Sequence, residues 1–528
     1  MKKIIQIAFS PAIFFLFNSL QAQVPAIEWQ KCLGGSNNEA AFSIEQTAEG
    51  NFIVAGYSDS NDGDVTGNHG SDDYWIVKLD PASNILWQKS LGGNSIDEAN
   101  SINQTADGGF IVAGFSYSNN GDVTGNNGAD DYWIVKLDST GDILWEKSLG
   151  GSGDEGANCI QQTFDGGFIV TGWSSSNDGD VTGNHGLWDY WLVKLDTSGN
   201  LEWEKSFGGS LNDMAYSVQQ TIDGGFIVAG YSESSDGDVS GNHGFRDYWI
   251  IKTDADGNLL WQTFLGGTEY DEAHSIIQLK EGGYLVAGFA GSANGDVTGN
   301  HGSYDFWVVK LDTAGNLEWN SCLGGSSVDQ SFSIEQTIDG GSVVAGQSNS
   351  NNGDVSENHG GYDNWVVKLD TSGNVEWQKS LGGSADDYGP YSIHQIALDE
   401  YITSGATLSN DEDVSGNHGG SFYGDCWIVK LSTDIETGIP SIPNSHISLF
   451  PNPVQNEITI NLGNLSDPLF SITIEVYDMH GRSIEVSTTI LNNRIQISTT
   501  YLPDGFYTIL ISDNKTGKME VEKFVKQE

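Results

Sequence analysis

Short hydrophobic runs separated by polar turns fill the chain from residue 27 to residue 432. In the first repeat, Val, Ile, Phe, Trp and Tyr concentrate in four runs, and Gly, Asp and Asn lie between them. Runs of this composition, bounded by turn residues, predict β-strands. In the first repeat we expect these strands at residues 42–47, 52–57, 74–79 and 85–91.

Two series of tryptophans give the repeat its length. A spacing of 58 residues separates Trp75 from Trp133 in the third predicted strand and Trp29 from Trp87 in the fourth. Four antiparallel strands in such a period predict one blade of a β-propeller. The third-strand series is Trp75, Trp133, Trp191, Trp249, Trp307, Trp365 and Trp427. The sequence therefore predicts an all-β fold with a seven-bladed β-propeller over residues 27–432.

The closure of this ring is also predicted. No fourth strand follows Trp427, whereas residues 27–31 match a fourth strand and precede the first blade. We expect this N-terminal strand to complete blade seven, because a closed ring leaves no unpaired strand edges.

The N-terminus has the pattern of a secretory signal. Lys2 and Lys3 precede an apolar run over residues 4–17, and a short polar segment ends at Ala22. This pattern predicts a signal peptide over residues 1–22, cleaved at Ala22. No later apolar run approaches the roughly 20 residues of a membrane-spanning helix, so we expect no transmembrane segment in the mature protein.

Beyond a predicted linker at residues 433–446, the composition changes. Residues 447–528 contain no Trp, and alternation such as Ile472, Ile474 and Val476 predicts a small β-sandwich domain. The repeat motif "DYWIVKLD…GN…WQKSLGG" resembles the tryptophan-marked propeller repeats of exported bacterial proteins. The motifs "LFPNPVQNEITI", "IEVYDMHGRSI", "LPDGFYTILI" and "KFVKQE" resemble the type A C-terminal sorting domain of the type IX secretion system. This second resemblance implies that residues 447–528 contact the type IX machinery and that the protein reaches the outer cell surface or the medium.

The charge limits the partners. The chain carries 72 acidic and 22 basic residues, a net charge of -50. Nucleic acid is excluded as a partner, because phosphate backbones are bound by dense Lys and Arg. Cations or cationic surfaces suit this charge better.

A polar loop, "GDVTGNHG" at residues 63–70, recurs in near-copies between the second and third strands of every repeat. In a propeller this loop lies on the same face as the acidic connection between blades. Its oxygen-rich side chains suggest calcium as a cofactor, although His69 stands where an EF-hand requires Glu. The alternative is that Asp and Asn stabilise turns by bonding their own backbone, and that the recurring His braces the loop. The candidate calcium ligands are Asp62, Asp64, Asn68, Asp122, Asp180, Asp238, Asp296, Asp354 and Asp413.

A single binding site would need residues that most blades lack. Such residues are Tyr388, Tyr391, His394, Tyr423 and Arg246, our ligand-binding candidates. No nucleophile elbow, zinc signature or catalytic triad is present. Our first hypothesis is a non-enzymatic surface propeller that binds a glycan or a surface protein on its acidic loop face. The alternatives are an endoglucanase-like, polysaccharide-degrading enzyme or its accessory module, and a calcium-stabilised structural surface protein.

The cysteines offer one test of ring closure. If the hairpin between the third and fourth strands has five residues throughout, Cys426 and Cys32 are opposed across blade seven. A disulfide between them is then plausible in an exported protein. The alternative is four unpaired buried thiols.

Overall fold

The computed structural model describes residues 23–419 and 424–433, together with the strands between residues 448 and 526 and a few residues beside them. The chain divides after Thr433 into two compact units. The predicted signal peptide with Ala22, residues 434–446 of the predicted linker, and Tyr423 lie outside the described residues.

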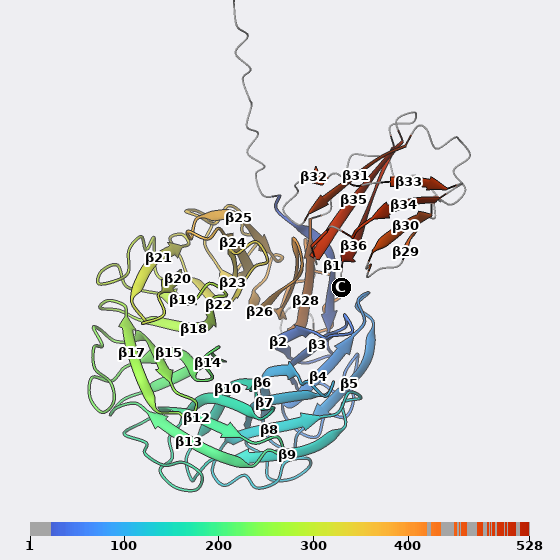
Figure 1. The fold of residues 1–528 in the computed structure, drawn as a ribbon. Helices are drawn as coiled ribbons and strands as arrows, with labels where there is room; N and C mark the ends of the chain where they lie inside the picture. Colours follow the sequence, from blue (N-terminus) through green and yellow to red (C-terminus); the bar gives the residue numbers. More distant parts are fainter. Residues whose placement is uncertain are drawn as a thin grey trace, which may run out of the picture. The chain divides into compact units, whose positions relative to one another are not determined.

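The first unit consists of seven four-stranded antiparallel sheets arranged around a ring (Figure 1). Blade one contains β2 (Glu39–Gln46), β3 (Phe52–Ser58), β4 (Asp73–Leu79) and β5 (Ile85–Leu91). The next three blades are β6 (Asp97–Gln104), β7 (Phe110–Ser116), β8 (Asp131–Leu137) and β9 (Ile143–Leu149); β10 (Glu155–Gln162), β11 (Phe168–Ser174), β12 (Asp189–Leu195) and β13 (Leu201–Phe207); and β14 (Asp213–Gln220), β15 (Phe226–Ser232), β16 (Asp247–Thr253) and β17 (Leu259–Leu265). Blades five and six are β18 (Asp271–Gln278), β19 (Tyr284–Ala290), β20 (Asp305–Leu311) and β21 (Leu317–Leu323); and β22 (Asp329–Gln336), β23 (Ser342–Ser348), β24 (Asp363–Leu369) and β25 (Val375–Leu381). The first strand of each blade lies nearest the centre of the ring, which confirms the predicted seven-bladed propeller (Figure 1).

Blade seven joins the two ends of the ring. It contains β26 (Asp387–Ala397), β27 (Glu400–Thr407), β28 (Asp425–Ser432) and, as its outer strand, β1 (Ala26–Leu33). β1 pairs antiparallel with β28 along its whole length. The predicted closure by the N-terminal strand is thus confirmed.

From blade one to blade five, an aromatic side chain of the third strand packs onto the third-strand Trp of the next blade. The rings of Tyr132 in blade two and Trp191 in blade three are 4.6 Å apart, and both are fully buried. The Tyr132 hydroxyl also donates a hydrogen bond to the Trp191 carbonyl (3.0 Å). Because aromatic side chains bury a large apolar area, this repeated pair supplies much of the core between blades.

The register of the outer strands corrects the predicted disulfide. A β-bulge between Ile27 and Trp29 shifts the pairing of β1 by one residue, so that Cys32 lies opposite Trp427 and Leu33 lies opposite Cys426. Neighbouring positions on a strand point to opposite faces of the sheet. Cys32 accordingly belongs to the core between blades six and seven, and Cys426 to the core between blades seven and one. Both thiols are free, and the predicted Cys32–Cys426 bond is wrong.

The second unit contains two four-stranded sheets. One has the order β29-β30-β34-β33, and the other has the order β32-β31-β35-β36. The strands are β29 (Ser448–Phe450), β30 (Glu457–Asn461), β31 (Ile472–Asp478), β32 (Ser483–Ile484), β33 (Thr488–Leu491), β34 (Arg494–Ser498), β35 (Gly505–Asp513) and β36 (Lys518–Lys526). Ile458 and Ile497 of the first sheet share a buried core with Val476 and Ile509 of the second. In the described part of the chain, no helix is long and apolar enough to cross a membrane.

Candidate functional site

The repeated polar loop packs against the connection that enters its own blade. In blade one, an Asp62 carboxylate oxygen accepts a hydrogen bond from the Ser36 amide (2.8 Å), and the Asp64 amide donates to the Gly34 carbonyl (2.9 Å). The Gly34 amide in turn donates to Asp64 Oδ2 (3.4 Å). The loop and the connection therefore lie on one face, which we call the loop face.

The other candidate calcium ligands take part in similar contacts. The Asn68 amide group donates to the carbonyls of Ser58 and Ser71, and its oxygen accepts from the Gly70 amide. In the other blades, the backbone amide at the Asp64 position also bonds to a connection glycine, at Asp122, Asp180, Asp238, Asp296, Asp354 and Asp413. Among the described residues, no three His, Cys, Asp or Glu side chains form a group that could hold a metal. Turn formation accounts for these contacts, and calcium binding stays a prediction.

The recurring histidine braces the loop. His69 donates from its backbone amide to Asp73 Oδ2 (2.8 Å), and its Nδ1 atom lies 2.8 Å from the same oxygen. In blade two the Asn127 amide keeps the backbone contact to Asp131 Oδ2 (2.8 Å) without an imidazole. The predicted bracing role of His69 is thus confirmed.

The carboxylates that accept these loop contacts are buried and lie close to other acids. Asp131 Oδ1 is completely buried and has no hydrogen-bond partner. A side chain at Gly150 would begin 2.6 Å from this oxygen and against Glu155 Oε2, so only glycine fits between the two acids. Burial, aided by the charge of Glu155 and opposed by the hydrogen bond from Asn127, raises the pKa of Asp131 to about 6.

Some of the positions at which the blades differ lie where the strands reach the loop face. Every third strand has a Trp at the same position. At the loop-face end of the strands, in contrast, three positions carry different residues in different blades. We call these positions the mouth. At the end of the second strand they are Tyr57, Phe115, Trp173, Tyr231, Phe289, Gln347 and Ala406. Opposite them on the first strand they are Ala40, Glu98, Gly156, Met214, Glu272, Gln330 and Tyr388, and before the third strand they are Asp72, Asp130, Trp188, Arg246, Tyr304, Tyr362 and Gly424.

Arg246 is anchored between blades four and five of the mouth. Its guanidinium donates to Glu233 (2.7 Å) and to Glu272 (2.5 Å), and it lies 4.3 Å from the ring centre of Tyr231 and 5.3 Å from that of Tyr270. The two carboxylates offset its charge. This predicted ligand residue therefore stiffens the mouth, and it presents no free positive charge to a ligand.

The other predicted ligand residues are spread along blade seven. Tyr388 lies in the mouth, where its hydroxyl donates to Asp386 (3.1 Å) and its ring is 5.9 Å from that of Tyr362. Tyr391 and His394 follow further along β26. The structure therefore does not gather Arg246 and the blade-seven residues into one cluster.

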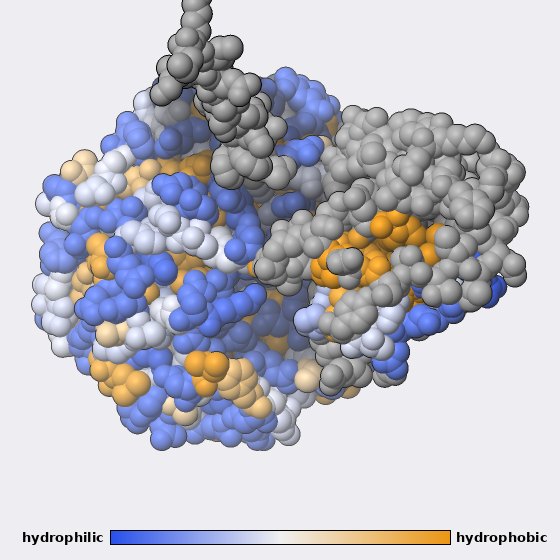
Figure 2. Space-filling view, turned by 45° about the horizontal axis from the view of Figure 1, so that its top comes forward, coloured by the Kyte–Doolittle hydropathy of each residue, from blue (hydrophilic) through white to orange (hydrophobic). Residues whose placement is uncertain are grey.

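Most aromatic side chains in and beside the mouth were not among the predicted ligand residues. The rings of Trp173 and Trp188 in blade three are 4.8 Å apart, and the exposed ring of Phe245 stacks on Tyr270 at 5.3 Å. An alignment of the seven repeats with one another would have revealed them. Figure 2 shows a mainly hydrophilic propeller surface on which hydrophobic residues form small, separate groups.

Two acids of the mouth have pKa values near neutrality. Burial, followed by the charge and hydrogen bond of Asp154, raises the pKa of Asp130 to about 7. Burial and the charge of Asp72 raise the pKa of Glu98 to about 7. The mouth thus combines aromatic rings with carboxyl groups that exchange protons near pH 7.

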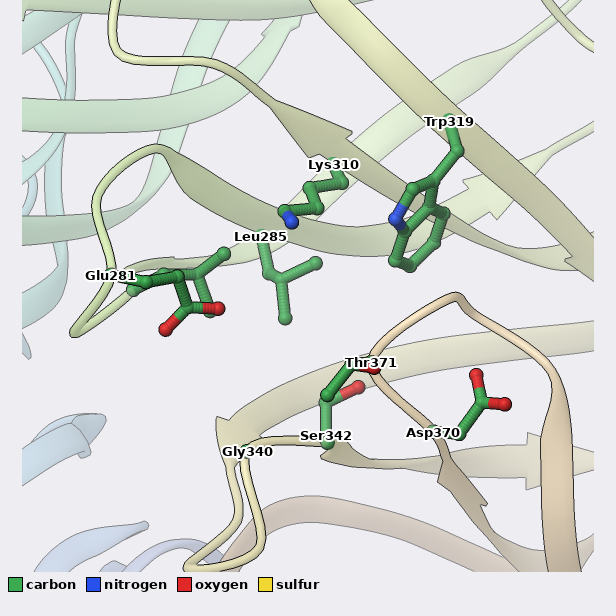
Figure 3. A pocket seen from close by; sticks show the side chains of 10 residues that line it. Glu281, Leu285, Lys310, Trp319, Gly340, Ser342, Asp370 and Thr371 are labelled. Atoms are coloured by element: carbon green, nitrogen blue, oxygen red, sulfur yellow. The ribbon is translucent and has the colours of Figure 1, made fainter.

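A small hollow lies at the opposite ends of the strands, between blades five and six (Figure 3). Lys310, Trp319, Leu285 and Thr371 line it. Its volume of about 210 Å³ includes open solvent and is below the roughly 300 Å³ at which ligand pockets begin. We assign no function to it.

Comparison with known proteins identifies the second unit. Residues 448–527 match the family of secretion system C-terminal sorting domains. The regulatory protein FlaEY of Caulobacter vibrioides is 26% identical over 203 residues, which cover 35% of this chain and 21% of FlaEY. The chain thus spans about a fifth of that relative's length.

Several solved structures are similar at low identity. A puromycin hydrolase matches with a TM-score of 0.36 and 11% identity, covering 72% of this chain and 60% of that chain. The WD40 domain of SCAP from fission yeast matches with a TM-score of 0.31 and 7% identity, covering 95% and 90%. PorZ, a surface component of the type-IX secretion system of Porphyromonas gingivalis, matches with a TM-score of 0.14 and 10% identity, covering 93% and 87%. Scores this low carry no argument about function. The sorting-domain match, in contrast, implies interaction with the secretion machinery. The chain is thus a seven-bladed β-propeller followed by a C-terminal sorting domain of the type IX secretion system, which directs it to the cell surface or the extracellular space.

Proposed function

We propose that this exported propeller is a binding protein that holds a glycan or a surface protein at the mouth of its loop face. The observation that carries the proposal is the variation between blades. The Trp of the third strands, which lies in the core between blades, is the same in all seven repeats. The mouth positions depart from this uniformity while they keep the same place in the fold.

The composition of the mouth supports binding. Trp173 and Trp188 provide flat apolar surface, and Tyr270 and Phe245, beside the mouth, add a second such surface near blade five. Exposed aromatic rings bordered by polar groups are typical of interaction sites. The nearby carboxylates accept hydrogen bonds from hydroxyl or ammonium groups.

Hydrolysis of a glycan is less well supported. Glycosidases place two carboxyl groups about 5–9.5 Å apart on either side of the bond they cleave. Asp130 and Asp154, in contrast, are close enough for a hydrogen bond that raises the pKa of Asp130. This pair is closer than the separation that glycosidases use.

The test uses the exported chain on a glycan array and against surface proteins of its own organism. We expect Trp173→Ala to weaken the binding that is found by about tenfold or more, as buried aromatic contacts at interfaces do. The matched control is Phe164→Ala, since Phe164 is an exposed aromatic residue in the turn between β10 and β11, at the opposite end of blade three. Equal binding by both variants would refute a site at the mouth. Release of reducing sugar from a polysaccharide by the wild-type chain would show that the protein is an enzyme and would refute the proposal that it only binds.

A further inference from the structure

Every innermost strand contains a bulge at the same point. In blades one to six the register shifts by one residue, as between Ala41 and Ser43 in β2 and between Ser331 and Ser333 in β22. In β26 the irregularity extends from Tyr388 to Ser392. A bulge inserts an unpaired residue and redirects its side chain, and bulges are frequent beside functional sites.

The inserted residue changes between blades while its neighbours do not. The preceding residue is Ala or Ser in blades one to six, and the following residue is Ser or Cys. The constant Ser has a structural role, since Ser43 Oγ accepts a hydrogen bond from the Ile102 amide of the next blade (3.3 Å). The variable residues are Phe42, Asn100, Asn158, Tyr216, His274, Phe332 and, in blade seven, Tyr391. We call these seven residues the collar.

The collar is a chain of neighbours around the centre of the ring. Ring centres are 5.1 Å apart between Phe42 and Tyr391, 5.2 Å between Tyr391 and Phe332, and 5.3 Å between Phe332 and His274. Tyr216 stacks on His274 at 4.2 Å. Among the described residues, no ring contact joins opposite sides of the collar, and each of its members stays partly exposed.

The two remaining blades close the collar with amides. Asn100 and Asn158 each donate to the backbone of the next blade, to the carbonyls of Ala157 and Ala215 (both 2.8 Å). The collar therefore has an aromatic arc over five blades and a polar segment over two.

The surroundings of the aromatic arc are negative. None of the seven innermost strands contains Lys or Arg. Burial lowers the pKa of His274 to about 3, which leaves its ring neutral. Glu45 and Glu335 follow the collar on their strands, and Glu335 Oε2 lies 3.6 Å from His394 Nδ1. Burial lowers the pKa of His394, but the hydrogen bond and charge of Glu335 and the charge of Glu45 outweigh it and raise this pKa, so a protonated His394 offsets part of their negative charge.

We infer that the collar binds a small organic cation, an ammonium or guanidinium group that enters along the axis of the propeller. The negative faces of aromatic rings attract a cation within about 6 Å of the ring centre. Because the five rings are only 4.2–5.3 Å from their neighbours, a guest at the arc lies within reach of more than one ring. Glu45 and Glu335 outnumber His394 and therefore add to this attraction. The inference goes beyond the proposed function, because the collar is a different set of residues from the mouth.

The test is calorimetric titration of the full exported chain with choline and, separately, with 3,3-dimethylbutan-1-ol, which has the same shape without the charge. We expect choline to bind at least about tenfold more tightly than the neutral alcohol. Nα-acetyl-lysine amide and Nα-acetyl-arginine amide form further arms, which distinguish a free quaternary ammonium from a peptide side chain. Equal affinity for choline and the alcohol, or no binding of any of the four probes, would overturn the inference.

Variants locate the site. Phe332→Leu keeps the apolar packing and removes the ring, so we expect it to lower affinity for the cation about fivefold to tenfold. Glu335→Gln is expected to lower it as well, whereas Asp256→Asn, which removes the same charge from an exposed hairpin, is expected to leave it unchanged. Unchanged affinity in Phe332→Leu would refute the collar as the site. Trp173→Ala separates the two proposals, because it impairs a ligand of the mouth while it leaves choline binding intact.

Discussion

Replacement of Asp131 by Asn is expected to stabilise the propeller at neutral pH. In the folded protein Asp131 is fully buried beside Glu155, and one of its oxygens has no partner. An amide in place of the carboxylate removes the buried charge beside Glu155. The contact from the Asn127 amide to the other oxygen is retained.

The size of the effect follows from the pKa. Burial raises the pKa of Asp131 from 3.8 to about 6, and each pKa unit corresponds to 1.36 kcal/mol. The folded state therefore holds the proton more tightly than the unfolded chain does. The free energy of unfolding falls by up to about 3 kcal/mol as the pH rises from about 4 through 6. The Asn variant is spared this loss, so it gains up to about 3 kcal/mol at pH 7.5 and little at pH 4.

Urea unfolding followed by tryptophan fluorescence measures this difference. Residues 447–528 contain no Trp, so the signal reports the propeller alone. Asp131→Ala is the structural control, because it loses the Asn127 contact and should be less stable at both pH values. Asp138→Asn, at an exposed hairpin, is the second control. Hydrogen bonds lower the pKa of Asp138, so this variant should not gain stability at pH 7.5 relative to pH 4. The reasoning is refuted if Asp131→Asn raises the free energy of unfolding equally at pH 4 and pH 7.5, or lowers it at pH 7.5.

Three further predictions concern the ring itself. Peptide mapping without reduction should find Cys32 and Cys426 unlinked, and a linked peptide would contradict the register of β1. Chelation with EDTA tests the calcium prediction: a clear decrease in melting temperature would support calcium binding by the loops, because a bound ligand stabilises the folded state by mass action, and an unchanged melting temperature would leave only the turn role. Trp191→Ala should cost about 3–5 kcal/mol in the same urea assay, the usual cost of truncating a buried large aromatic side chain, and a loss below about 1 kcal/mol would show that the core between blades does not depend on it.

The repeat made the ring predictable, but the local register was not. The spacing of the Trp series and the isolated strand at residues 27–31 were sufficient to predict seven blades and their closure. In the hairpin of blade one, a bulge between Lys78 and Leu79 shifts the pairing by one residue and places Tyr74 opposite Leu91. A bulge depends on strand twist and packing, which the alternation of residue types does not reveal. The same one-residue shift after Ile27 is the reason that the predicted disulfide is wrong.

The site was predictable in its parts and unpredictable in its assembly. The turn role of Asp64 and the bracing role of His69 follow from residues that are close in sequence. The clamp on Arg246, in contrast, uses Glu272 of the following blade, 26 residues away. The collar joins Phe42 to Tyr391 across the closure of the ring. Such contacts require knowledge of which blades adjoin and in which register.

Closure by the N-terminal strand also constrains how the protein is made. The hydrogen bond from Trp427 to Gln30 joins residues 397 positions apart in the chain. Until β28 has been synthesised, β1 has no partner and the half-built ring presents open strand edges, which invite aggregation. Contacts between such distant segments also slow folding. A secreted protein with this topology must therefore avoid aggregating with other chains until nearly all of it has been synthesised. Protection of the incomplete chain from aggregation would therefore benefit the cell.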